Sequence, residues 1–547
     1  MNQIEANLKS VLVDAAKKAF DTDVEMEKVV IEIPKDKSHG DYSTNLAMQL
    51  TRVLRNNPRV IAEGLKTNLD MAAADIEECE IAGPGFLNFK IKNTSLAQVI
   101  EKVLKEQDAY GNNESGNHQK INVEYVSANP TGDLHLGHAR GAAWGDSITR
   151  LLKASGYDVT REYYVNDAGN QIANLGKSLQ ARYREFLGLD FVLPEDGYHG
   201  EDVKNIAIEL AKQYKETYVE ENDENLRFFK EKGIEFELNK IKRDLDYFRV
   251  HFDVWSSEQK IRDDGKVEKA LAVLADKGLS YEQDGALWFR TTDFGDDKDR
   301  VLRKTDGSYT YLVPDIAYHK DKLDRGFDVL VDLLGADHHG YIPRLKASIQ
   351  ALGNNPDKLQ VDIIQMVRLV ENGEEVKMSK RLGNAVTIRE LCDEVGVDSV
   401  RYFFVQRAVD THLDFDLGLA RKQSNDNPVY YAQYAHARIC SILRQAPDFK
   451  AAESYDLLTH EKEISLMKYI NEFTNVVSDA AKTRAPHKVC NYIQKLAQHF
   501  HSFYNACKVI DADNEALSAQ RLALLKATKI TLKNALYLIG VDAIEKM

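Results

Sequence analysis

The spacing of apolar residues divides the chain into three segments with different periods. Residues 1–115 begin with an amphipathic helix, and continue with a strand at residues 29–34 and an alternating strand after the glycine turn at residues 81–91. Residues 121–400 alternate strand-like and helical runs. From about residue 420 the spacing is purely helical. We therefore predict an N-terminal α+β domain, a middle α/β domain and a C-terminal all-α helix bundle.

The middle segment has the alternation that is typical of a doubly wound parallel sheet. Strand-like runs at residues 121–127, 158–165, 327–335 and 361–370 are separated by helical runs. Because parallel strands need a crossover between them, this order predicts a Rossmann-like sheet with helices on both faces. Residues 190–285 interrupt the alternation with charged helical sequence, which we interpret as an insertion between the halves of the sheet.

The domain boundaries follow from these changes in pattern. The polar, turn-rich residues 111–120 serve as a linker, and a second boundary lies where the helical spacing takes over. That helical end predicts a bundle of four or more helices. We predict domains at residues 1–115, 116–419 and 420–547.

Composition adds limits on where the protein works and what it binds. No run of about 18 apolar residues occurs, so we predict no membrane-spanning helix. The five cysteines are scattered and form no CxxC pair, which favours a reducing compartment such as the cytoplasm and disfavours a cysteine zinc site. The net charge is −14, but residues 420–547 carry +4. This permits a phosphate-bearing partner at the helical end, although charge alone favours ordinary scatter as the explanation.

A first chemical signal is NPTGDLHLGH, residues 129–138, between a predicted strand and a predicted helix. A helix that begins directly after a sheet strand presents free backbone N–H groups and a positive dipole end, which suits a phosphate. Gly137 allows close approach of a ligand. His135 and His138 lie one turn apart and could both hydrogen-bond one polyphosphate; the alternative is a structural or solvent-facing pair. With no third ligand at metal spacing, we expect no metal site there.

A second signal is VKMSKRLGNAV, residues 376–386. Lys377, Lys380 and Arg381 crowd around Ser379 here, and lysines so placed can stabilise the charge of a leaving pyrophosphate. The alternative interpretation is a solvated basic turn.

Together the two segments resemble the two signatures of class I aminoacyl-tRNA synthetases. Further stretches narrow the resemblance to arginyl-tRNA synthetases: VEYVSANPTGDLHLGHARGAA, REYYVNDAGNQI, DDKDRVLRKTDGSYTYLVPDIAYH, GADHHGYIPRL and LKNALYLIGVDA. The resemblance implies that ATP activates L-arginine to arginyl-adenylate, and that arginine then passes to the terminal adenosine of tRNA(Arg). It also implies Mg²⁺ accompanying ATP, a monomer, no membrane, an N-terminal tRNA-contacting domain and a C-terminal anticodon-binding domain.

The resemblance also implies roles for individual residues. The implied catalytic residues are His135, His138, Lys377 and Lys380. The implied ATP-binding residues are His135, Gly137, His138, Gly335, Asp337, Met366, Lys377, Met378, Ser379 and Lys380. The implied arginine-binding residues are Glu124, Ser127, Asn129, Tyr311, Asp315 and His339. Carboxylates suit a guanidinium, which offers five N–H donors. Three alternatives stay open: Asp315 as a helix N-cap, Glu124 as an exposed strand residue and Tyr311 as a core aromatic residue.

Two other functions stay open at this point. One is a synthetase for another amino acid, which the candidate carboxylates disfavour because they suit a cationic substrate. The other is a non-catalytic tRNA-binding paralogue, which the two intact signatures disfavour. For the RNA contact itself, aromatic side chains at the helical end are candidates to stack on exposed bases, with bundle core as the alternative role. These candidates are Tyr430, Tyr431, Tyr434 and Tyr537.

Overall fold

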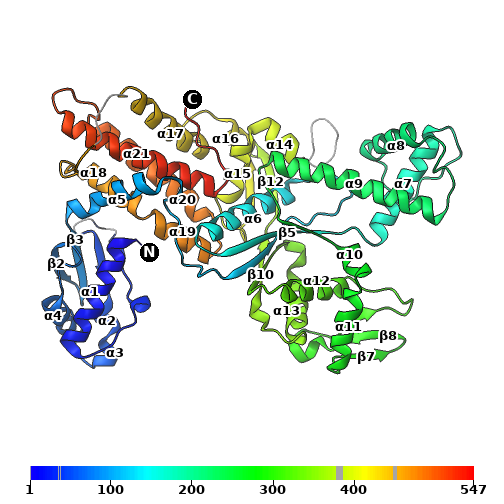
Figure 1. The fold of residues 1–547 in the computed structure, drawn as a ribbon, viewed down its shortest axis with the longest axis horizontal. Helices are drawn as coiled ribbons and strands as arrows, with labels where there is room; N and C mark the ends of the chain where they lie inside the picture. Colours follow the sequence, from blue (N-terminus) through cyan, green and yellow to red (C-terminus); the bar gives the residue numbers. More distant parts are fainter. Residues whose placement is uncertain (1, 35, 37–38, 377–385, 447–451) are drawn as a thin grey trace.

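The computed structural model describes residues 2–34, 36, 39–376, 386–446 and 452–547. In Figure 1 the N-terminal domain (blue) and the C-terminal helices (orange and red) lie to one side of the central part of the molecule, and two further lobes extend on the other side. No helix in these ranges is both long enough and apolar enough to cross a bilayer. All five cysteines are buried and free.

The N-terminal domain packs helices on a small antiparallel sheet of order β1-β3-β2. The strands are β1 (Tyr42–Thr44), β2 (Ile76–Ala82) and β3 (Phe86–Ile91), and the helices are α1 (Gln3–Phe20), α2 (Leu46–Gln49), α3 (Thr51–Leu54), α4 (Pro58–Asn68) and the 3-10 turn η1 (Met26–Lys28). The strand predicted at residues 29–34 is wrong. Only Glu32 pairs there, with Ser43, because β1 is three residues long and its other edge is occupied by β3.

The central sheet has the order β11-β10-β4-β5-β6, and all of its pairings are parallel. Its strands are β4 (Lys120–Glu124), β5 (Asp158–Val165), β6 (Val254–Ser257), β10 (Val329–Gly335) and β11 (Leu359–Ile364). The predicted doubly wound fold is therefore confirmed. The chain builds outward from β4 through β5 and β6, and later in the opposite direction through β10 and β11. A crevice forms at such a reversal, beyond the carboxyl ends of the strands.

Helices connect the strands of this sheet and pack against it. The buried helix α6 (Leu136–Ala154) follows β4, and α12 and α13 flank β10. The other elements of this part are α10 (Glu258–Asp263), α11 (Lys266–Asp276), β7 (Ser280–Gln283), β8 (Ala286–Phe289), η4 (Thr291–Phe294), β9 (Arg300–Arg303), α12 (Leu312–Asp324), η5 (Ala336–Tyr341), α13 (Ile342–Ala351) and η6 (Pro356–Lys358). The preceding elements α5 (Asn93–Glu106) and η3 (Gln107–Ala109) pack instead against C-terminal helices.

The predicted insertion at residues 190–285 contains a helical lobe, an edge strand of the central sheet, and helices α10 and α11, which pack with α12 in another core. Helices α8 (Glu201–Tyr214) and α9 (Asp223–Tyr247) pack with α7 (Asn170–Phe186) around a core of their own; these helices form the lobe at the upper right of Figure 1. Strand β6, in contrast, is the edge strand of the central sheet. Four residues are too few to show a strand period, so the sequence did not separate β6 from the helices before it.

The apolar run at residues 361–370 also divides. Its first part ends β11, and its second part forms β12 (Val367–Glu371), which pairs with β13 (Glu374–Glu375) and β14 (Leu413–Asp416) in a different sheet. The turn between the two strands is held by the buried Arg140. Its guanidinium donates to the carbonyl oxygens of Gln365 at 2.8 Å, Thr411 at 2.9 Å and Ala408 at 2.9 Å. The elements that follow are α14 (Ile388–Val395), α15 (Val397–Val405) and α16 (Leu417–Arg421).

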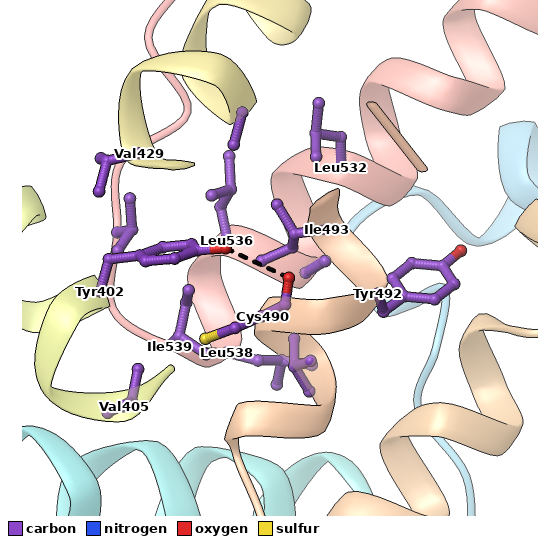
Figure 2. Packing of buried hydrophobic residues seen from close by; sticks show 14 of the residues in the cluster. Tyr402, Val405, Val429, Cys490, Tyr492, Ile493, Leu532, Leu536, Leu538 and Ile539 are labelled. Carbon is purple, nitrogen blue, oxygen red and sulfur yellow. Dashed lines mark hydrogen bonds between the residues drawn. The ribbon is translucent and has the colours of Figure 1, made fainter. Parts of the chain in front are cut away.

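The C-terminal helices form the predicted bundle, and they share a hydrophobic core with the middle domain. They are α17 (Pro428–Arg444), α18 (Glu461–Asn471), α19 (Phe473–Lys482), α20 (His487–Ala506) and α21 (Glu515–Leu538). Figure 2 shows the junction: Tyr402 of α15 lies among Val429, Leu536 and Ile539, and its hydroxyl donates to the carbonyl oxygen of Cys490 at 3.2 Å. The bundle is thus fixed to the sheet domain by continuous packing.

Candidate active site

A cavity of about 860 Å³ opens beyond the carboxyl ends of the central strands. Its walls combine residues that follow β4, β5, β6, β10 and β11, so it lies at the reversal point of the sheet. Eleven of the residues implicated by the sequence line it: Glu124, Ser127, Asn129, His135, Gly137, His138, Tyr311, Asp315, Gly335, Asp337 and Met366.

The remaining implicated residues fall into two groups. His339 is exposed on η5 and is not among the residues that line the cavity, whereas its neighbour His338 is. Lys377, Met378, Ser379 and Lys380 lie outside the described residues. Their flanking residues Val376 and Val386 do line the cavity.

One end of the cavity is formed by the first turn of α6. His135 is the N-cap of this helix, and its Nδ1 accepts the backbone N–H of Gly137 at 3.2 Å. The backbone N–H of His135 in turn donates to Nδ1 of His138 at 3.3 Å. The two imidazole rings stack with their centroids 3.8 Å apart. A Cβ at Gly137 would lie 3.2 Å from the ring of His135, so glycine leaves this face of the turn uncovered.

These hydrogen bonds determine the state of both histidines. Since each Nδ1 accepts a backbone N–H, each neutral ring carries its proton on Nε2, which remains a donor. Burial lowers the pKa of His135. Burial and the neighbouring His135 lower the pKa of His138 to about 4. At neutral pH the pair therefore offers two N–H donors at a helix N-terminus without carrying charge, which suits an anionic phosphate.

The segment after the second signature is joined to this turn. His135 and Thr387 form an isolated antiparallel bridge, and the backbone N–H of Ile388 donates to the carbonyl oxygen of Leu134 at 2.8 Å. Thr387 also caps α14. Positions that are about 250 residues apart in the sequence are thus fixed next to each other at the mouth of the cavity.

Carboxylates dominate the other end of the cavity. Glu124, at the end of β4, is 8% exposed and accepts the Ser127 hydroxyl at 3.0 Å and Lys322 Nζ at 2.5 Å. Val126 and Ser127 both have positive φ, at 70° and 40°. Such a conformation is costly for residues other than glycine and is found where a ligand site demands it. It turns the Ser127 hydroxyl to accept the backbone N–H of Tyr164 at 3.0 Å.

Asp315 lies within the first turn of α12 and points into the same cavity. Its Oδ2 accepts the Tyr341 hydroxyl at 2.5 Å. Burial raises the pKa of Asp315 to about 6, the Tyr341 hydrogen bond opposes this rise, and the charges of Glu124 and Glu258 add to it. Glu258 also lines the cavity, and Arg262 binds its carboxylate. The arrangement can therefore hold a compact cation at this end and a phosphate at the other.

Comparison with known proteins gives the same assignment for each part of the chain. The family described as "Arginyl tRNA synthetase N terminal domain" matches residues 6–91, "tRNA synthetases class I (R), catalytic domain" matches residues 99–406, and "DALR anticodon binding domain" matches residues 432–547. A curated arginine–tRNA ligase of Bacillus subtilis (strain 168) is 59% identical over 528 residues, which cover 96% of this chain and 95% of the relative.

The chain belongs to the arginyl-tRNA synthetase family. The arginine–tRNA ligase of Bacillus pumilus is a second relative, 56% identical over 553 residues that cover 100% of this chain and 99% of the relative. Among solved structures, Thermus thermophilus arginyl-tRNA synthetase matches with a TM-score of 0.76 at 22% identity. The match covers 99% of this chain and 100% of the Thermus thermophilus chain. At that identity the likeness shows a common fold.

The structure excludes the three alternative roles that the sequence left open for candidate arginine-binding residues. Asp315 is not the N-cap of α12, because that position is Tyr311. Glu124 is not exposed. Tyr311 is not a core residue, because it is 83% exposed and lines the cavity at its surface.

Sequence reasoning missed several residues that line or support the site. Asn166 and Gln171 follow β5 and line the cavity, and Gln171 accepts Asn129 Nδ2 at 2.6 Å. The signal for these two was present, because residues that follow a parallel strand gather at the same edge of the sheet as those that follow β4. Tyr341 and Lys322 gave no such signal, because the pocket carboxylates that they bind, Asp315 and Glu124, lie 26 and 198 residues away in the sequence.

Proposed function

We propose that this chain is an arginine–tRNA ligase that activates arginine with ATP and transfers it to the 3′-terminal adenosine of tRNA(Arg). The observation that supports this most strongly is that one cavity is lined both by the carboxylates of Glu124 and Asp315 and by a pair of neutral imidazole donors. The carboxylates of Glu124 and Asp315 would bind the arginine side chain, with Tyr311, Ser127 and Asn129 beside them. His135 and His138 would hold the phosphates of ATP.

The first chemical step needs positioning more than covalent assistance. The carboxylate of arginine attacks the α-phosphorus of ATP, and pyrophosphate leaves. Nε2–H groups of the two histidines would donate to phosphate oxygens, while Gly335, Asp337 and Met366 would surround the rest of the nucleotide. Lys377 and Lys380 would stabilise the negative charge that builds on the leaving pyrophosphate.

Mg²⁺ would enter with ATP in this proposal. No group of three or more His, Cys, Asp or Glu residues in the described part of the chain could hold a metal ion. Most ligands of this cation would therefore be phosphate oxygens and water molecules, as Mg²⁺ prefers. We further propose a monomer that works in the cytoplasm, where charged tRNA is consumed.

A set of half-buried aromatic side chains and one exposed arginine on α17 and α20 supports the RNA contact. Tyr430 and Tyr434 are half-buried, and their rings are 6.1 Å apart and nearly parallel. Arg438 is exposed, lies 5.0 Å from the Tyr504 ring and is hydrogen-bonded to its hydroxyl. Rings and guanidinium groups of this kind stack on unpaired bases and contact phosphates. Tyr431 is half-buried and packs against the bundle core, whereas Tyr537 is 63% exposed.

The decisive experiment is amino-acid-dependent exchange of pyrophosphate into ATP in the presence of tRNA, followed by charging of bulk tRNA. Arginine alone should support both reactions. Exchange with a different amino acid would replace the substrate in this proposal. A protein that binds tRNA tightly but supports exchange with no amino acid would be a non-catalytic paralogue.

A further inference from the structure

Lys322 is a buried cation enclosed by carboxylates behind the proposed arginine pocket. Its side chain is 0% exposed, and Nζ lies 2.5 Å from Oε2 of Glu124 and 3.0 Å from Oδ1 of Asp332. Nζ also lies 4.3 Å from the centroid of the Tyr318 ring. Burial alone would lower the pKa of Lys322, but Asp332 and Glu124 raise it above its ordinary value. The ammonium group is therefore charged at neutral pH.

Asp332 has a second partner, His319, on α12, the helix that also carries Lys322. His319 Nε2 lies 2.8 Å from Oδ2 of Asp332, and His319 Nδ1 lies 2.8 Å from the backbone carbonyl oxygen of Asp315. Because that carbonyl can only accept, Nδ1 carries a proton. Asp332 thus fixes both Lys322 and His319, and through His319 the backbone at Asp315.

Glu124 and Asp315, the two carboxylates proposed to bind arginine, differ in how a nearby cation neutralises their negative charge. Glu124 is neutralised by Lys322, and two of its roughly four acceptor positions are occupied by Lys322 and Ser127. Asp315 accepts a hydrogen bond from Tyr341 and forms no ion pair in the described ranges, although the charge of His319 acts to lower its pKa. Of the two, only Glu124 makes a direct ion pair among the described residues, and this pair holds its carboxylate in one orientation.

We propose that Lys322 is a positioning residue for amino-acid selection, which fixes the Glu124 carboxylate and leaves Asp315 as the charge that the guanidinium of arginine neutralises. This inference rests on the proposed function. Lys322 does not line the cavity, so it acts on the substrate only through Glu124. Removing its charge releases Glu124 to reorient and gives the pocket a second uncompensated carboxylate.

The test measures pyrophosphate exchange by Lys322→Met as a function of arginine and of ATP concentration. The KM for arginine should rise by roughly 10-fold or more, as contacts within one buried network are coupled, while the KM for ATP stays unchanged. Lys320→Met is the matched control: it lies on the same helix, and its partner Asp324 is at the surface, 2.7 Å away. Its kinetics should equal those of the wild type. Equal rises in both KM values would overturn the proposal.

A double-mutant cycle separates positioning from general damage. If Lys322 acts through Glu124, Lys322→Met should change the KM for arginine at least 5-fold less in a Glu124→Gln background than in the wild type. A purely structural role predicts the same fold-change in both backgrounds, and that result would overturn the proposal.

A folded variant is available if Lys322→Met is unstable. Lys322→Gln combined with Asp332→Asn removes one charge of each sign and keeps an amide donor near Glu124; it is compared with Asp332→Asn alone, and the same outcomes decide. The wild-type protein reports on the proposed function separately. Arginine-dependent exchange by the wild type with unaltered KM values in the variants removes only the role of Lys322, whereas a wild type inactive with arginine removes both proposals.

Discussion

Asp315→Asn should make the protein more stable and less able to bind arginine. The substitution keeps the shape of the side chain and an oxygen that can accept the Tyr341 hydroxyl. It removes a half-buried negative charge that forms no ion pair among the described residues and that the charge of His319 only partly offsets. Such a carboxylate stabilises a bound guanidinium but lowers the stability of the folded protein when no ligand is bound.

The magnitude follows from the pKa of Asp315, which is raised from 3.8 to about 6 by burial. A carboxylate whose pKa is raised in the folded state makes that state less stable as the pH rises from 3.8 to 6. Above pH 6 this destabilisation stays constant. The asparagine variant should therefore gain about 2 kcal/mol at pH 5 and about 3 kcal/mol at pH 7. Between pH 7 and pH 5 the ionised fraction of Asp315 falls from about nine-tenths to about one-tenth, so the affinity of the wild type for arginine should fall roughly 10-fold.

Two measurements check this prediction. Thermal unfolding of both proteins between pH 5 and pH 7.5 gives the stability difference, and calorimetric titration with arginine at the same pH values gives the affinity. His319 titrates in both proteins, so the difference between the two reports on Asp315. Citrulline, which has a neutral urea group, is the matched ligand. A site built for a charged group can reject such an analogue by about 10⁴–10⁵, and this advantage of arginine should shrink in the variant.

Two results would refute the reasoning. The first is a variant that is less stable than the wild type at pH 7, which would mean that the carboxylate is already compensated. The second is an unchanged ratio of arginine to citrulline binding, which would place the guanidinium at another carboxylate.

Two further predictions concern the second signature and the helical end. Lys377→Ala or Lys380→Ala should slow pyrophosphate exchange by roughly 10²–10³ while arginine affinity is retained, because the lost interaction is with the leaving group; unchanged exchange in both variants would indicate a solvated basic turn. Tyr434→Ala should weaken tRNA binding with little change in its salt dependence, whereas Arg438→Ala should reduce that dependence in a titration from 50 to 200 mM salt. Full tRNA affinity in both would place the RNA on another face.

The sequence predicted the parts of the fold that are long and periodic. The α/β alternation gave the parallel sheet, and the 3-4 spacing gave the C-terminal helices. Short elements were lost. Strand β6 has four residues, and the break at Gln365 between two apolar strands does not alter the local pattern. That break depends on Arg140, whose three carbonyl partners lie more than 200 residues away. Such contacts belong to the tertiary structure and leave no period in the sequence.

The candidate site divides in the same way. His135, Gly137 and His138 were found because their chemistry is local: a strand, a glycine and a helix N-terminus. Glu124 and Asp315 were assigned through family resemblance, because either could have been an ordinary polar residue on its own element. Lys322 could not be found by either route. It looks like one more surface lysine of α12, and its burial results from β4 and β10 closing over it.

The core around Tyr402 has a consequence for how such enzymes can change. Because α15, α17, α20 and α21 contribute side chains to one packed interior, the helical end cannot be exchanged between relatives as an independent module. A chimera that joins the first 419 residues of one relative to the C-terminal helices of another should inherit mismatched cavities and clashes at this seam. Substitutions that compensate there should accumulate in pairs across the seam as lineages diverge, independently of any change in which tRNA the enzyme selects.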